Sequence, residues 1–187
     1  FPTPQLIKDI DTGNMKNLDA YIKLQTYTDH LSDWLKFLGL AEKIQISNDG
    51  KIEINQGSAS ETGTTLENIG VGVSQVLPVL LSCMTSQKNE NNEILLLEQP
   101  ELHLHPSAQA KLADFFIAVS VTNKKTLFVE THSEHILNRL RLRKIQLRDI
   151  NEFIKIFFST KQTNGQTQIE KNNATHRQSL CAPPLGA

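Results

Sequence analysis

Two short polar blocks each follow an apolar run, and their side chains are of the kinds that do chemistry. Glu98-Gln99-Pro100-Glu101 follows the run EILLL, and Glu130-Thr131-His132-Ser133 closes and follows the run TLFVE. In open α/β sheets, ligands sit just beyond the carboxyl ends of the strands. A carboxylate and a histidine at one such edge could hold a metal-bound anion and orient a water molecule.

A third block, Ile69-Gly70-Val71-Gly72-Val73-Ser74-Gln75, opens a predicted helix. Two glycines let backbone amides approach a ligand closely, and a helix N-terminus offers free N–H groups with partial positive charge. This combination suits a phosphate. Taken alone, the block is equally well interpreted as an ordinary turn before a helix.

The elements that must position these blocks form a strand, a helix and a strand. Residues 93–97 and 126–130 are short apolar runs that predict strands buried on both faces. Between them, Pro106 suits the start of a helix, and an apolar stripe follows it at Ala108, Leu112, Phe115, Phe116 and Val119. The order predicts a βαβ unit with parallel strands, and hence an α/β fold with a largely parallel sheet flanked by helices.

The rest of the chain is predicted as a set of smaller elements. Residues 1–14 suggest an irregular start, 15–40 a helix, 44–55 a hairpin around Asn48-Asp49-Gly50, and 56–68 a loop. Helices are expected over 75–84 and 135–143, and a closing antiparallel pair over 151–159 and 165–170. We therefore expect an N-terminal part (1–65), a core (66–171) and a tail (172–187) that has no pattern and suggests disorder.

Composition excludes several classes of protein. The 187 residues carry 19 Lys+Arg against 20 Asp+Glu, a balance that argues against a dedicated nucleic-acid coat protein. Cys83 and Cys181 are far apart, so neither a disulfide framework nor a zinc knuckle is indicated. No apolar run has transmembrane length, so no membrane partner is expected and the cytoplasm is the default location.

Together the three blocks resemble the C-terminal half of the ABC-type ATPases, within the P-loop NTPase superfamily. The order Gly-x-Gly-x-Ser-Gln, then LLLEQPELHLHP, then FVETHSEH is most similar to the RecF-like and OLD-like bacterial AAA/ABC ATPases, over about residues 66–160. The resemblance implies ATP and Mg²⁺ as cofactors. It implies a signature loop at residues 70–75, with nucleotide contacts from Gly70, Gly72, Ser74 and Gln75. It implies a Walker B strand at 95–98, with Glu98 organising Mg²⁺, a D-loop at 102–106 and a switch histidine at His132.

Two positions depart from the pattern of that family. The residue after the Walker B acid is usually a glutamate that polarises the attacking water, and here it is Gln99, which cannot accept a proton. Catalysis would then be slow or would use Glu101 or Glu98. Gly70 occupies the usual place of the signature serine, so Ser74 is the candidate hydroxyl.

The phosphate-binding P-loop is the larger gap. No Gly-x-x-x-x-Gly-Lys-Ser/Thr occurs in the sequence, although the family carries one near its N-terminus. Without its backbone cradle and lysine, triphosphate binding should be poor. We therefore expect a fragment that lacks the upstream half and is inactive alone.

The expected function is ATP binding and hydrolysis by a head-to-tail homodimer, in which each site combines one subunit's P-loop, Glu98 and His132 with the other's Gly72 and Ser74. One alternative is a nucleotide-gated interaction module that Gln99 keeps from hydrolysing ATP. Another is a DNA-linked defence or repair ATPase with a DNA or nuclease partner, suggested by the basic run that includes Arg139, Arg141 and Arg143. A zinc site at the histidine pairs 103/105 and 132/135 is a weaker option.

Overall fold

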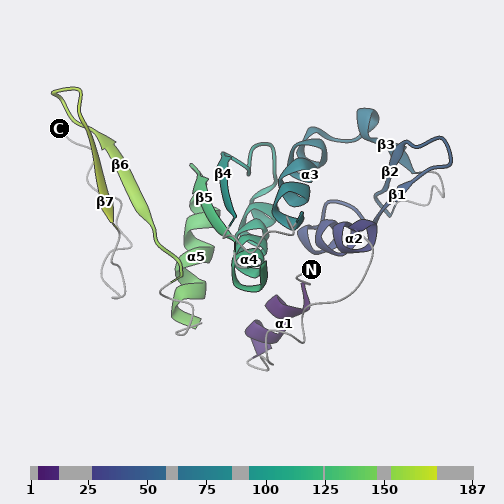
Figure 1. The fold of residues 1–187 in the computed structure, drawn as a ribbon, viewed down its shortest axis with the longest axis horizontal. Coiled ribbons are helices and arrows are strands. Elements are labelled where there is room, and N and C mark those ends of the chain that lie inside the picture. The colour runs from purple at the N-terminus through teal and green to yellow at the C-terminus, as the bar shows by residue number, and fades with distance from the viewer. Residues whose placement is uncertain are drawn as a thin grey trace. The chain divides into compact units, whose positions relative to one another are not determined.

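The computed structural model describes residues 4–12, 27–57, 63–85, 93–123, 125–146 and 153–171. Along the chain (Figure 1) the elements are α1 (Gln5–Thr12), α2 (Tyr27–Leu38), β1 (Lys43–Ile46), β2 (Ile52–Asn55), β3 (Thr64–Thr65), the 3₁₀ turn η2 (Leu66–Asn68), α3 (Val71–Met84), β4 (Ile94–Glu98), α4 (Pro106–Asn123), β5 (Thr126–Glu130), α5 (Glu134–Gln146), β6 (Phe157–Lys161) and β7 (Thr167–Lys171). Their contacts group the chain into two units, residues 1–140 and 141–187. The tail predicted at 172–187 lies outside the described residues.

The predicted βαβ unit is confirmed. Strands β4 and β5 pair in parallel, with Ile94 opposite Thr126 and Glu98 opposite Glu130, and α4 forms the crossover between them. Leu95, Leu97, Leu127 and Val129 pack against the hydrophobic core, where α3 contacts β4 and α4 contacts β5. The fold is therefore α/β, as the strand–helix–strand order predicts.

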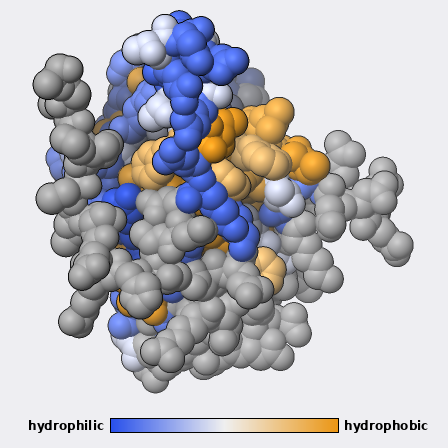
Figure 2. Space-filling view, turned by 90° about the vertical axis from the view of Figure 1, so that its left-hand side faces the viewer, coloured by the Kyte–Doolittle hydropathy of each residue, from blue (hydrophilic) through white to orange (hydrophobic). Residues whose placement is uncertain are grey.

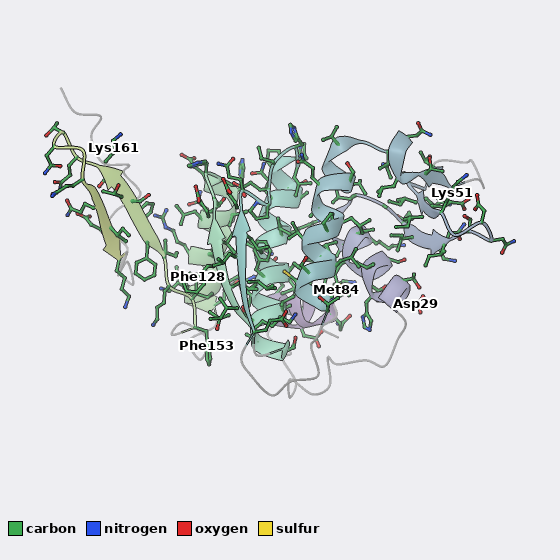
Figure 3. All side chains as sticks on the ribbon, turned by 45° about the horizontal axis from the view of Figure 1, so that its top comes forward. Asp29, Lys51, Met84, Phe128, Phe153 and Lys161 are labelled. Carbon is green, nitrogen blue, oxygen red and sulfur yellow. The ribbon has the colours of Figure 1, made fainter. Side chains whose placement is uncertain are left out.

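The prediction that both faces of these strands are buried is wrong for the described residues. Exposure alternates along β4 and β5, and Ile94, Leu96 and Phe128 on one face are 60%, 78% and 57% exposed. In Figure 3, Phe128 lies on the side of β5 that faces away from α3 and α4. An apolar run shows only that a strand can be covered on both sides, and here the described helices α3 and α4 cover one.

The N-terminal segment holds a helix where we expected irregular chain. Helix α1 begins after Pro4, whose carbonyl oxygen accepts hydrogen bonds from the amides of Ile7 (3.1 Å) and Lys8 (3.3 Å). Proline is tolerated just before a helix because the first N–H groups there have no acceptor within the helix, so its missing N–H is not needed. Ile7 is 1% exposed, so burial in the core fixes a helix that is too short to be stable alone.

Helix α2 and the β1–β2 hairpin form the next layer. The predicted helix over 15–40 is described from Tyr27 to Leu38, and its earlier part lies outside the described residues. Strands β1 and β2 pair antiparallel as predicted, with Gly50 at φ 78° in the turn. The Ser32 hydroxyl accepts the amide of Ile44 (3.0 Å) and so ties α2 to β1. The stretch predicted as loop contains β3, which adds to β2, and η2.

The core lies among α2, α3 and α4. Trp34 is fully buried, with its ring in edge contact with Phe115 at 4.8 Å between centroids. Each large apolar side chain buried in this way contributes about 1.5–3 kcal/mol. Burial also raises the pKa of the Cys83 thiol to about 12, so this cysteine is protonated and unreactive at neutral pH.

A buried lysine joins the end of α3 to the start of β5. Lys125 is 4% exposed, pairs with Glu93 at 2.9 Å, and donates to the carbonyl oxygens of Ser82 and Thr85. A cation suits the C-terminus of a helix because the last carbonyls lack helical partners. This contact fixes where the chain enters β5.

The second unit contains the predicted antiparallel pair. Strands β6 and β7 run from Phe157 opposite Lys171 to Lys161 opposite Thr167, with Gly165 at φ 83° in the turn. All ten strand residues are exposed. Among the helices described in the whole chain, none is long and apolar enough to cross a membrane.

Candidate functional site

The candidate site lies at the carboxyl edge of the β4–β5 sheet. Glu98 and Glu130 end the two strands directly opposite each other, and both side chains are exposed. His132, also exposed, follows Glu130 by two residues. Glu98 therefore ends β4, and His132 follows the adjacent, co-directional strand β5 at the same edge, which is the arrangement that the sequence required.

Gln99 turns the chain out of the sheet. Its amide donates to the carbonyl oxygen of Glu130 (2.8 Å), which extends the ladder by one bond, and its φ angle is 41°. A positive φ is unfavourable by about 1–2 kcal/mol for a residue with a Cβ atom. Two backbone hydrogen bonds hold the following turn (residues 99–105). The amide of Leu102 donates to the carbonyl oxygen of Gln99 (3.2 Å), and the amide of Leu104 donates to the backbone carbonyl oxygen of Glu101 (3.1 Å). His103 in this turn also has a positive φ of 60°.

Glu101 points into the protein and not toward the exposed edge. It is 6% exposed, and its Oε1 accepts the Thr131 hydroxyl (2.6 Å) and the His132 amide (3.0 Å). Its Oε2 is buried and has no hydrogen-bond partner among the described residues. The carboxylate thus connects the turn after β4 with residues 131–133 after β5, which we call the switch segment.

The switch segment is also tied to α4. The Ser133 hydroxyl donates to Gln109 Oε1 (2.6 Å) and accepts the amide of Ile136 (3.2 Å), so that Ser133 caps the N-terminus of α5. Gln109 in turn donates to the carbonyl oxygen of Leu104 (2.9 Å). The turn after β4 is therefore joined to the switch segment twice, through Glu101 and through Gln109.

The glycine block lies beside the same turn. Gly70 precedes α3 and Val71 is its first residue. Gly72 and Ser74 therefore belong to the helix and not to the loop that we expected before it, while Gln75 lies in the helix as predicted. A Cβ atom on Gly72 would lie 2.9 Å from the backbone oxygen of His103, closer than real contacts allow. The Ser74 hydroxyl donates to the Val71 carbonyl oxygen (2.9 Å), and Gln75 is exposed.

The acidic side chains at the edge suit a hard cation bound together with phosphate. Mg²⁺ prefers oxygen ligands and is usually held by one or two carboxylates plus phosphates and waters. Glu98 is exposed at the sheet edge with Glu130 beside it, which fits that use. In the part of the chain that the structure describes, no group of three or more His, Cys, Asp or Glu side chains could hold a metal ion. One histidine of the two weaker zinc pairs, His105, instead contacts Ser107 Oγ (2.9 Å) and its amide (3.3 Å) at the start of α4.

The basic run on α5 makes internal contacts. Arg139 donates three hydrogen bonds to the buried Asp114 carboxylate, at 2.7–3.1 Å, and approaches Asp11 at 3.9 Å. Arg143 is buried and donates to Gln146 (2.7 Å). Neither guanidinium is free to neutralise a nucleic-acid phosphate, so these two arginines serve the fold.

Comparison with known families identifies the chain. The AAA ATPase domain family matches residues 3–137, which include all three candidate blocks. The chain belongs to this family. It is therefore an ATPase domain of the P-loop NTPase class, a family that uses nucleotide, typically with Mg²⁺.

A solved structure supports the fold of this ATPase domain. It comes from work on the ATP-driven dimerization and DNA-stimulated activation of SMC ATPases, with a TM-score of 0.54 and 14% identity over 78% of this chain and 82% of that chain. At this identity the likeness concerns the fold alone. Among curated proteins no relative matches.

The sequence did not predict all of the residues that organise the site in this AAA ATPase domain. Thr131 and Gln109 carry the bonds between the turn and the switch segment, and neither was singled out. A serine directly before a helix is a recognisable capping signal, which could have identified Ser133. Thr131 bonds to Glu101, 30 residues away, and Gln109 bonds to Ser133, 24 residues away, so no local pattern predicts these contacts.

Proposed function

We propose that this chain supplies one part of an ATP-hydrolysing site that forms between two copies arranged head to tail. In each site, Glu98 and His132 of one copy act with Gly70, Gly72, Ser74 and Gln75 at the start of α3 of the other. The supporting observation is that Glu98 ends β4 and His132 follows the adjacent parallel strand β5 at the same edge. The dimerization driven by ATP in the structurally similar SMC work makes a two-copy site reasonable here.

The roles follow from the chemistry of each group. Glu98 would hold Mg²⁺, which when bound neutralises charge on the phosphates. His132 would donate a hydrogen bond to the terminal phosphate, where charge changes during hydrolysis. The N-terminus of α3 offers free backbone N–H groups and partial positive charge, which suit the phosphate held by the opposite copy.

We propose that the P-loop is contributed by polypeptide outside these 187 residues. None of them forms a Gly-x-x-x-x-Gly-Lys-Ser/Thr motif. The uncovered face of β4 and β5 also supports this, because parallel sheets are normally covered on both faces. Hydrolysis must therefore be assayed in a protein that includes the P-loop segment.

The test is ATP turnover by that protein with Glu98→Gln or His132→Ala. We expect a loss of kcat on the order of 100-fold or more for each, since each removes a group aimed at the reacting phosphates. Glu134→Gln and His135→Ala are matched controls, because both are exposed residues just after the switch segment. Turnover unchanged in both site variants would refute the proposed roles.

A second function, a nucleotide gate without appreciable hydrolysis, is favoured by Gln99. A neutral amide can orient water but cannot take its proton. Single-turnover hydrolysis should then rise at least about tenfold in Gln99→Glu, with Gln56→Glu on the surface as control. Rapid turnover by the unmodified protein would exclude the gate.

A further inference from the structure

Among the described residues near the candidate site, Glu101 is the one carboxylate that is buried. Its Oε1 accepts two donors from the switch segment, the Thr131 hydroxyl at 2.6 Å and the His132 amide at 3.0 Å. A glutamate with 6% exposure cannot reach a water molecule at the exposed edge. Its position therefore argues against the water-activating role that Gln99 would leave open.

Burial of this carboxylate has a physical cost that its contacts offset. A buried carboxylate is unfavourable unless it is hydrogen-bonded, and bonds that it accepts are about twice as strong as neutral ones. Oε2 has no hydrogen-bond partner in the described part of the chain, so the carboxylate is held by the two hydrogen bonds to Oε1. One donor to Oε1 is the backbone amide of His132 itself, and the other is the hydroxyl of the preceding residue, Thr131.

A second connection makes the geometry of the switch segment well determined. Thr131 Oγ1 accepts the amide of Ser133 (3.0 Å), and the Ser133 hydroxyl donates to Gln109. Gln109 donates back to Leu104 in the turn that carries Glu101. The bonds form a closed circuit through the turn after β4, the switch segment and the first turns of α4.

We propose that Glu101 is a positioning residue that fixes the backbone of His132, so that the turn after β4 sets the direction from which the histidine reaches phosphate. The first claim, that Glu101 fixes the backbone of His132, is mechanical and needs only the contacts above. The catalytic part rests on the proposed function, because it requires that His132 meets phosphate. Two readouts separate these parts.

The first readout is amide hydrogen exchange at His132, measured by NMR on this chain. In Glu101→Ala the amide loses its acceptor, and exchange should be at least about tenfold faster, in line with a bond to a charged group. Thr131→Val tests the same circuit without emptying the carboxylate site. Thr131→Ser keeps the hydroxyl and should preserve slow exchange. Glu134→Ala, an exposed acid two residues past His132, is the control and should leave His132 exchange unchanged.

A result against the proposal is equally clear. If His132 exchange stays slow in both Glu101→Ala and Thr131→Val while the amides of β4 and β5 stay protected, Glu101 does not hold the segment. If Glu101→Ala does not fold, Thr131→Val decides alone, since exchange at His132 must still rise with β4 and β5 protected. Exchange that rises equally in Thr131→Ser would also refute it, because the hydroxyl would then be irrelevant.

The second readout is ATP turnover in the protein that carries the P-loop. We expect Glu101→Gln, which keeps the shape and one oxygen acceptor, to retain more activity than Glu101→Ala. In Glu101→Ala, kcat should fall at least about tenfold with KM within about twofold, because positioning matters in the transition state and less for binding. If exchange rises but the unmodified protein has no turnover, the proposed function fails and the mechanical role of Glu101 stands. If exchange rises while kcat in an active protein does not change, the catalytic part of the proposal is wrong.

Discussion

Gly72 has no side chain at a place where a Cβ atom would lie 2.9 Å from the backbone oxygen of His103 and 3.3 Å from Leu104 Cδ2. The His103 oxygen belongs to a turn that is already strained, with positive φ angles at Gln99 and His103. Residues of this kind persist only where the surroundings hold them. At the scale of single residues, the site depends on a close approach between the start of α3 and the turn after β4.

Gly72→Ala should therefore destabilise the protein by about 1–3 kcal/mol, because backbone and not a flexible side chain must move. Gly70→Ala is the matched control. Gly70 has φ −57° and nothing within 4 Å of its ideal Cβ position, so its substitution should change stability by less than about 1 kcal/mol. Urea denaturation gives both values. Equal effects at the two glycines would contradict the close approach.

At the scale of elements, α4 and α5 are joined by a buried ion pair. Asp114 is 0% exposed and accepts three hydrogen bonds from Arg139, whose side chain is 26% exposed. The two-pronged geometry orients both helices around the crossover that places β5 beside β4. The sequence suggested a basic helix face that binds nucleic-acid phosphate, since the run of arginines says nothing about a carboxylate 25 residues earlier.

Arg139→Leu should cost about 2–4 kcal/mol, because Asp114 loses three hydrogen bonds while it remains buried. The double substitution Arg139→Leu with Asp114→Leu should recover part of that loss, since the buried charge is then removed as well. Thermal or urea unfolding of the unmodified protein, of each single variant and of the double variant measures the coupling. A double variant that is as unstable as the sum of both single variants would show that the pair is not coupled.

At the scale of the whole chain, the β4–β5 sheet is covered by α3 and α4 on one face only among the described residues. Ile94, Leu96 and Phe128 expose their side chains on the other face. Figure 2 views the molecule from the left-hand side of Figure 1 and shows hydrophobic residues, in orange, gathered on this side. Exposed apolar area of this kind is unfavourable in water and marks a surface that binds other apolar groups.

This chain alone should bind the apolar dye ANS in its folded state. Leu96→Thr with Phe128→Thr should lower ANS fluorescence by about half or more, because these two side chains are a large part of the open face. Ile46→Thr is the control, since Ile46 is 65% exposed but belongs to the β1–β2 hairpin. ANS fluorescence that falls as much in the control as in the sheet variant would mean that the dye does not report on this face.

Local pattern was sufficient for much of the fold. Alternating apolar residues around Asn48-Asp49-Gly50 predicted the β1–β2 hairpin, and two apolar runs around a helical stripe predicted the parallel β4–β5 pair. These predictions succeed because turn residues and side-chain periodicity act within a few residues. Helix α1 was missed because its stability comes from burial of Ile7 in the core, which local periodicity does not report.

By itself, the sequence determined which polar groups stand at the ends of β4 and β5 and that parallel pairing brings Glu98 and His132 to one edge. Only the tertiary structure decided that the Glu101 side chain points inward and accepts hydrogen bonds from the switch segment. It also decided that Gly72 packs against the backbone oxygen of His103 and that Arg139 pairs with Asp114. The physical reason is the range of the forces. Strand order follows from local pattern and chain handedness, whereas the partner of a buried charge is set by whichever distant groups the packing brings within hydrogen-bond distance.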